Sequence, residues 1–200
     1  MAVKKSIKKV NTVKPVAVRT AKIVKNATSR VAVFAGSFDP FTLGHLDIAR
    51  RAASLFDELW ILVAVNASKN CMLGSQSRMA LVRKACAEIE NLKIAAYDGL
   101  TTDFMKQVGA CYLVRGVRNA RDMDYEQSVA WNNKILYPEC ESVYLSCAQE
   151  HLSVSSTVVR ELLKCGIVDT DGGMEKLEKF VPRCIAKNLV EEFRKVSGGR

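Results

Sequence analysis

The sequence has no long apolar run, few histidines and none of the paired cysteines that structural metal sites use. No stretch approaches the roughly 18 to 20 apolar residues needed to cross a bilayer, so we expect no membrane contact. Only His45 and His151 are present, and the seven cysteines include no C-x-x-C pair, which argues against a protein-held zinc ion. Scattered cysteines in odd number are typical of reduced thiols, so we expect a cytoplasmic protein.

Two common phosphate-binding signatures are also missing. The sequence contains no G-x-x-x-x-G-K-[ST] loop, and no G-x-G-x-x-G follows the first expected strand. Their absence removes the main support for a kinase or a dehydrogenase.

The net charge of +9 comes entirely from the first 30 residues, which contain nine Lys or Arg and no acidic residue. The remaining chain carries 21 basic and 21 acidic residues, so nucleic acid is an unlikely partner for the body of the protein. We interpret residues 1–30 as a basic leader. A disordered tail is favoured, although the lack of acids also resembles a transit peptide.

Residues 31–200 alternate short apolar runs with helical periodicity, which predicts a single α/β domain with a doubly wound, Rossmann-like parallel sheet and helices on both faces. At 48% hydrophobic composition this length can bury one core. We expect strands at 31–35, 60–65, 92–96, 112–114 and 143–145. We expect helices from about residue 44, at 75–90, 101–108 and 124–136, from Ser155 to about Lys164, and after Pro182.

The loop after the first expected strand reads Gly36-Ser37-Phe38-Asp39-Pro40-Phe41-Thr42-Leu43-Gly44-His45 and leads into a helix. Its glycines allow the backbone to approach a ligand, and the unpaired amides of a helix start favour an anion. His45, with the hydroxyl of Ser37 or Thr42, can donate to phosphate oxygens. The loop therefore predicts a phosphate site.

Two further segments fit the same chemistry. Arg115-Gly116-Val117-Arg118 follows the strand at 112–114, where two guanidiniums suit two phosphates, and Asp122-Met123-Asp124-Tyr125-Glu126 comes next. Ser155-Ser156-Thr157-Val158-Val159-Arg160 opens a late helix, whose hydroxyls and amides can bind phosphate a second time.

Together these segments resemble the phosphopantetheine adenylyltransferases, nucleotidyltransferases with a T-x-G-H form of the H-x-G-H signature. The resemblance covers about 31–164 and implies transfer of the adenylyl group of ATP to 4'-phosphopantetheine, with Mg²⁺ accompanying the ATP. It implies catalytic roles for His45, Lys69 and Arg118, and acceptor binding by Ser37, Lys69, Thr101 and Arg115. It implies ATP binding by Ser37, Phe38, His45, Gly116, Val117, Arg118, Glu126, His151, Leu152, Ser153, Val154, Ser155, Ser156 and Thr157.

The resemblance also implies a homo-oligomer, a hexamer as in bacterial members of the family. A related enzyme acting on nicotinamide mononucleotide or glycerol phosphate is the alternative, and Thr42, the two arginines and Tyr125-Glu126 favour phosphopantetheine. The segment 165–180 is longer than the family's usual turn. We expect both helix starts, at Gly44-His45 and Ser155-Ser156, to face one pocket.

Overall fold

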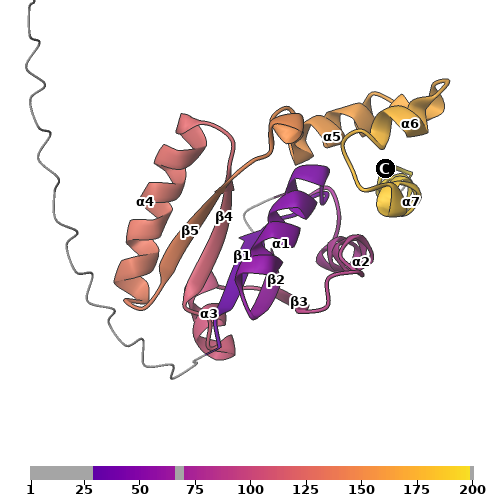
Figure 1. Cartoon of the computed structure of the whole chain (residues 1–200). Coiled ribbons are helices and arrows are strands. Elements are labelled where there is room, and N and C mark those ends of the chain that lie inside the picture. Colours follow the sequence, from indigo (N-terminus) through magenta and orange to yellow (C-terminus); the bar gives the residue numbers. More distant parts are fainter. Residues whose placement is uncertain (1–28, 66–69, 199–200) are drawn as a thin grey trace, which may run out of the picture.

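The protein forms a five-stranded, fully parallel sheet in a computed structural model that describes residues 29–65 and 70–198. The strands lie in the order β3-β2-β1-β4-β5 (Figure 1). Their bounds are β1 Val31–Gly36, β2 Glu58–Ala64, β3 Leu92–Tyr97, β4 Tyr112–Val117 and β5 Glu141–Ser146. The predicted doubly wound α/β sheet is confirmed.

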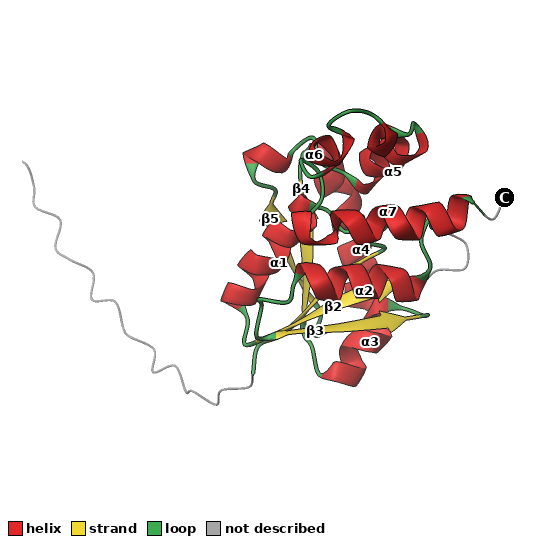
Figure 2. Ribbon diagram, turned by 90° about the vertical axis from the view of Figure 1, so that its right-hand side faces the viewer, coloured by secondary structure: helices red, strands yellow, loops and turns green. Residues whose placement is uncertain are grey.

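Each helix that follows a strand crosses back over the sheet, and the helices lie on both of its faces (Figure 2). The α-helices are α1 Leu43–Leu55, α2 Ser75–Ala85, α3 Thr101–Val108, α4 Ala120–Leu136, α5 Ser156–Lys164, α6 Gly173–Leu177 and α7 Arg183–Ser197. Two short 3-10 helices, Gln149–His151 and Ile167–Asp169, interrupt the later loops.

The central strand β1 shows why both faces are covered. Ala32 and Phe34 point into a core shared with α1, α2, α5 and α7, whereas Val33 and Ala35 point into a second core completed by α3. Because successive side chains in a strand alternate between the two faces, a strand buried on both sides must be apolar at nearly every position. The sequence Val31–Gly36 meets that requirement.

Several predicted boundaries were wrong, and the two nearest the site have a local reason. Strand β4 continues to Val117 rather than ending at 114, because Arg115 to Val117 pair with β5 although they break the apolar run. Helix α4 begins at Ala120 rather than 124, since the side chain of Asn119 accepts from the Asp122 amide and caps it. Helix α2 stops at Ala85 rather than 90.

The segment between α5 and α7 contains the second 3-10 helix and α6. A Cβ atom on Gly173 would come within 1.9 Å of the Ile167 carbonyl oxygen, so the close turn between these elements requires glycine. Strand order reverses beside β1, where β2 lies on one side and β4 on the other. Ligands of such sheets bind outside the carboxyl ends of the strands at this point.

Of the predicted leader, residues 1–30, only 29 and 30 are described. Lys69 also lies outside the described residues. Among the described residues, no helix combines the length and the apolar character that crossing a membrane requires.

Candidate active site

A cavity of about 730 Å³ opens at the carboxyl ends of the strands, at the reversal point beside β1. Its walls come from the loop after β1, the start of α1, the end of β4, the start of α4 and the start of α5. The lining includes twelve of the predicted site residues: Ser37, Phe38, His45, Thr101, Arg115, Gly116, Arg118, Glu126, Val154, Ser155, Ser156 and Thr157. Ser37 and Thr157, 120 positions apart in the sequence, therefore share one cavity.

Two helix starts face this cavity, as expected. Thr42 caps α1 and Ser155 caps α5, with each side chain accepting from an amide in the first turn. The Ser156 hydroxyl donates to the Pro40 carbonyl at 2.8 Å, which joins the start of α5 to the loop before α1. Because free amides remain at a helix start, the pair offers an anion two sets of donors.

His45 is held with one ring nitrogen committed to the helix cap. Its Nδ1 accepts from the Thr42 amide at 3.1 Å, so in the neutral ring the proton resides on Nε2. Phe38 packs edge-on against the imidazole with ring centroids 5.1 Å apart, and Phe41 packs at 5.5 Å. Burial, with smaller contributions from the charges of Arg118 and Arg115, lowers the pKa of His45 to about 4. The residue is therefore a neutral hydrogen-bond donor at neutral pH.

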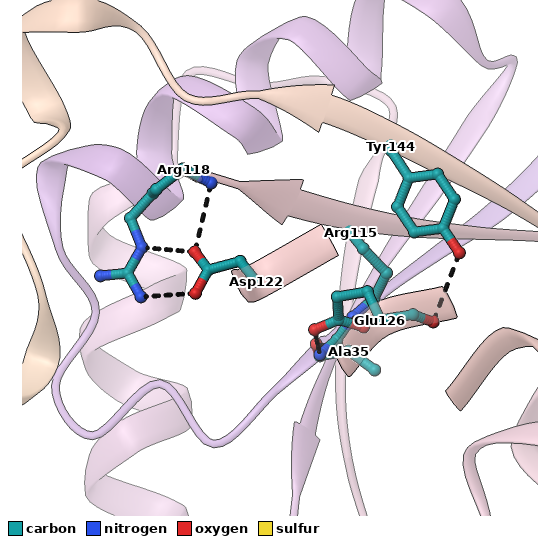
Figure 3. A network of polar contacts seen from close by, with 6 residues as sticks. All are labelled: Ala35, Arg115, Arg118, Asp122, Glu126 and Tyr144. Carbon is teal, nitrogen blue, oxygen red and sulfur yellow. Dashed lines mark hydrogen bonds and ion pairs between the residues drawn. The ribbon is translucent and has the colours of Figure 1, made fainter. Parts of the chain in front are cut away.

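Arg115 lies within β4 and forms a two-pronged ion pair with Glu126 of α4. Its Nε and Nη2 donate to the two carboxylate oxygens at 2.6 and 2.5 Å, and Nη1 donates to the Ala35 carbonyl at 2.6 Å (Figure 3). Tyr144 donates to the Glu126 carbonyl at 3.3 Å, which ties the same turn of α4 to β5. The arginine thus bridges β1, β4 and α4.

Arg118 follows β4 and pairs with Asp122, one turn into α4. The Nε atom donates to the carboxylate at 2.9 Å, and the Arg118 amide donates to the same oxygen at 3.2 Å (Figure 3). The Arg118 guanidinium, through this hydrogen bond, holds the pKa of the Asp122 carboxyl below its usual range. The ion pair is partly exposed, so it contributes little to stability and does not lock the arginine in place.

Four predicted site residues do not line the cavity among the described residues. Val117 is buried at the end of β4, and Leu152 is about half exposed after the first 3-10 helix. His151 lies beside Gly44, because a Cβ atom built on Gly44 would be 3.7 Å from the His151 Cβ. Ser153 directly precedes Val154, which lines the cavity. Lys69 lies outside the described residues.

The prediction missed several lining residues on α4: Arg121, Asp122 and Tyr125. Asp122 and Tyr125 belong to the segment singled out beside the two arginines but were given no site role, and a helix expected to begin at 124 left Arg121 outside it. A start at Ala120 places Asp122 and Glu126 four residues apart on one face of α4, with Arg121 and Tyr125 beside them. Arg118 lies just before the helix and pairs with Asp122. The Asn119 cap was the signal that could have revealed this. The lining arginines exceed the lining carboxylates by one, which favours an anionic ligand.

The described residues contain no group of three His, Cys, Asp or Glu side chains able to hold a metal ion. The carboxylates that line the cavity, Asp122 and Glu126, are both engaged with arginines. This donor set suits a Mg²⁺ ion that arrives on the phosphates of its ligand and keeps most of its water, rather than one held in a protein cage.

A family model described as cytidylyltransferase-like matches residues 33–162, well over half of the chain. The fold and the cavity with its two helix starts accordingly define a nucleotidyltransferase of this family. A solved structure of a lipopolysaccharide core biosynthesis protein from Thermoplasma volcanium aligns with a TM-score of 0.47 and 21% identity, covering 60% of this chain and 99% of that one.

Curated relatives narrow the assignment. Phosphopantetheine adenylyltransferase of Limosilactobacillus reuteri is 41% identical over 68% of this chain and 79% of its own length. The enzymes of that name from Dictyoglomus turgidum and Lachnoclostridium phytofermentans are 39% and 37% identical, over 82% of this chain and 97% and 96% of their own lengths. The chain belongs to the phosphopantetheine adenylyltransferase family.

Proposed function

We propose that this chain transfers the adenylyl group of ATP to 4'-phosphopantetheine, giving dephospho-coenzyme A and pyrophosphate. The observation that carries the proposal is the meeting of two helix starts and a neutral His45 in one cavity with an excess of arginine. The names of the relatives supply the identity of the two substrates.

The chemistry needs no catalytic base. The phosphate monoester of the acceptor has a second pKa of about 6, so at neutral pH it is largely dianionic and already nucleophilic. What the reaction requires is that two anions be brought together and that charge around the α-phosphorus be stabilised during in-line displacement. A His45 that stays neutral is a poor base and a good fixed donor, which suits this task.

The proposed residue roles follow from these two requirements. His45 donates Nε2–H to the reacting phosphoryl group. Arg118 and the start of α5, Ser155 to Thr157, hold the phosphates that leave as pyrophosphate. Lys69, Ser37, Thr101 and Arg115 hold the acceptor, and Mg²⁺ enters bound to ATP and neutralises part of its charge.

The remaining proposed contacts to ATP are those of Phe38, Gly116, Val117, Glu126 and the run from His151 to Val154. Gly116 lines the cavity, and the absence of a side chain lets Ile48 of α1 pack against it, since a Cβ atom there would lie 3.1 Å from Ile48. Glu126 reaches the nucleotide from the wall that also carries Arg115.

Pyrophosphate release tests the proposed reaction. The purified chain with ATP and 4'-phosphopantetheine should release pyrophosphate, and either substrate alone should give none. The alternative is another nucleotidyltransferase of the superfamily, so nicotinamide mononucleotide with ATP and glycerol phosphate with CTP belong in the same panel. Faster release with either of those pairs would reject phosphopantetheine as the acceptor.

We propose that the chain works as a homo-oligomer, a hexamer, with α4 at a contact between copies. In this 17-residue helix only Glu126 is buried, while Trp131 and Ile135 are 71% and 79% exposed. Large apolar side chains exposed together on one helix are typical of an interface. Sedimentation should show that the double change Trp131→Glu and Ile135→Glu reduces the assembly, whereas Val196→Glu on the exposed part of α7 does not.

We also propose a cytoplasmic location, supported by the cysteines. All seven are described, and all seven are free thiols. Fractionation of cells that express the full chain, including residues 1–30, would test this, because an organellar leader would carry the protein into another compartment.

A further inference from the structure

Arg78 of α2 is a buried cation whose side-chain hydrogen bonds, within the described residues, all go to backbone carbonyls. Arg78 is only 3% exposed, and no ion pair among the described residues includes it. Nε donates to the Leu73 carbonyl at 3.1 Å, while Nη1 donates to those of Ser37 and Ala64 at 2.5 and 3.1 Å. A guanidinium removed from water without a carboxylate is costly, so its place in the core calls for a reason.

The three carbonyls belong to three separate segments beside the cavity. Ser37 lies in the loop after β1, Ala64 ends β2, and Leu73 precedes α2. Ser37 and Ala64 both line the cavity, whereas Arg78 does not. Because the guanidinium is planar and presents its N–H groups in a fixed fork, these contacts fix the separation of the segments more firmly than a flexible cation would.

Asp39 carries the negative charge that balances Arg78, and the two side chains are linked by hydrogen bonds to the same stretch of backbone. Its carboxylate is also buried, and it accepts from the amides of Met72 and Leu73 at 2.6 and 2.9 Å. Leu73 therefore lies between an anion and a cation: its N–H donates to Asp39 and its carbonyl accepts from Arg78. This arrangement compensates both charges without a direct ion pair.

A second arginine holds the same loop from the opposite side. Arg160 of α5 donates from Nη1 to the Asp39 carbonyl at 2.7 Å, and it does not line the cavity either. The carbonyl oxygens of Ser37 and Asp39 are thus both engaged by guanidiniums outside the cavity lining. A carbonyl lone pair that faced a phosphate would repel it, so the direction of these peptides matters at an anion site.

We propose that Arg78 is a positioning residue for adenylyl transfer. Together with Arg160 it keeps the carbonyls of Ser37 and Asp39 turned away from the cavity, so that an incoming phosphate meets amide and hydroxyl donors of the loop. It also sets the distance between the loop after β1 and the end of β2, two segments that both line the cavity. The proposal rests on the proposed adenylyl transfer.

The test compares Arg78→Met and Arg78→Lys with Arg83→Met, a change of an exposed arginine on the same helix. Three quantities are measured on the full chain: turnover at saturating substrates, pyrophosphate affinity by calorimetry, and the folded fraction at the assay temperature. We expect Arg78→Met, corrected for folded fraction, to lose about 100-fold in turnover, the scale of a small misplacement of reacting groups. Its pyrophosphate binding should weaken as well.

Arg78→Lys should recover part of both losses, since an ammonium keeps the charge but lacks the rigid fork that spans carbonyls of three separate segments. Arg83→Met should match the parent chain. Folded Arg78→Met with normal turnover and pyrophosphate affinity would overturn the proposal. So would a loss that only follows the unfolded fraction, or a failure of both Arg78 variants to fold, because each assigns a purely structural role. A parent chain without adenylyl transfer would reject the proposed function instead, while pyrophosphate affinity would still test Arg78.

Discussion

The wall of the cavity built from the loop after β1 and the start of α1 is packed into the core, whereas the wall built from the end of β4 and the start of α4 is half open. On the first wall, Phe38 and Phe41 are buried and enclose His45. On the second, α4 buries only Glu126 and is attached through ion pairs of Arg115 and Arg118. The first wall is therefore set by folding, while the second can adjust to its ligands.

The difference between the two walls matches two different tasks in the proposed reaction. A group that must stabilise a transition state has to be in place before the reaction, and packing supplies that fixed geometry. Groups that capture and release phosphates must instead exchange partners, and partly exposed ion pairs exchange at little cost. The proposed roles of His45 and Arg118 follow this division.

The strongest test of the contrast is a matched truncation of one aromatic side chain in the loop after β1 and one in α4, the elements that carry the two walls. Phe41→Ala should lower the free energy of unfolding by about 3–5 kcal/mol, because it leaves a cavity where a fully buried ring packed. Trp131→Ala on α4 should change it by no more than about 0.5 kcal/mol when measured on dissociated chains. Urea unfolding gives both values, and similar losses at the two sites would contradict the contrast.

The next test removes the proposed donor. His45→Ala should lower turnover about 100- to 1,000-fold, the loss seen when one transition-state donor is removed, with ATP binding largely kept. His45→Gln should lose less, since its amide can still donate. Steady-state pyrophosphate release and calorimetric ATP titration separate the two effects. An alanine variant with unimpaired turnover would remove His45 from the mechanism.

Stability should also depend on pH through His45. Its pKa is about 4 in the folded chain, against an ordinary value of about 6.5 when unfolded, so the unfolded state binds the proton more readily. The stabilising contribution is complete above pH 6.5 and is lost as the pH falls toward 4. Because the ring is accessible from the cavity, we expect a loss of about 1–3 kcal/mol.

Thermal unfolding of the parent chain and of His45→Gln between pH 7 and pH 4.5 measures this contribution. The variant should show the shallower decline, since glutamine does not titrate. Parallel curves would mean that the environment of His45 does not depress its pKa.

The smallest expected effect concerns the ion pair that attaches α4. Glu126→Gln leaves the Arg115 guanidinium with one neutral acceptor in place of a carboxylate, so unfolding should become easier by about 1–2 kcal/mol. The affinity for 4'-phosphopantetheine should change only slightly, because the freed Arg115 guanidinium remains available to the acceptor. A loss as large as that of Phe41→Ala would show that the second wall is as rigid as the first.

Much of the site could be predicted because its segments are contiguous. Gly36 to His45 and Ser155 to Thr157 were recognised from local patterns, since helix starts and glycine loops are made by neighbouring residues. The boundaries around β4 and α4 were predicted less well. Arg115 and Asp122 belong to elements whose ends depend on pairing with β5 and on the Asn119 cap.

The order of residues along the chain was sufficient to specify the parallel α/β class, the family and the anion-binding segments, because these depend on periodicity and on short runs of particular side chains. It did not reveal that Arg115 and Arg118 are both paired with carboxylates, nor that Arg78 and Asp39 are both hydrogen-bonded to the backbone of Leu73. Those facts required the folded chain, because the protonation of His45, the partners of the arginines and the direction of the loop carbonyls are set by neighbours from distant elements. Burial and charge pairing are properties of that assembly in space.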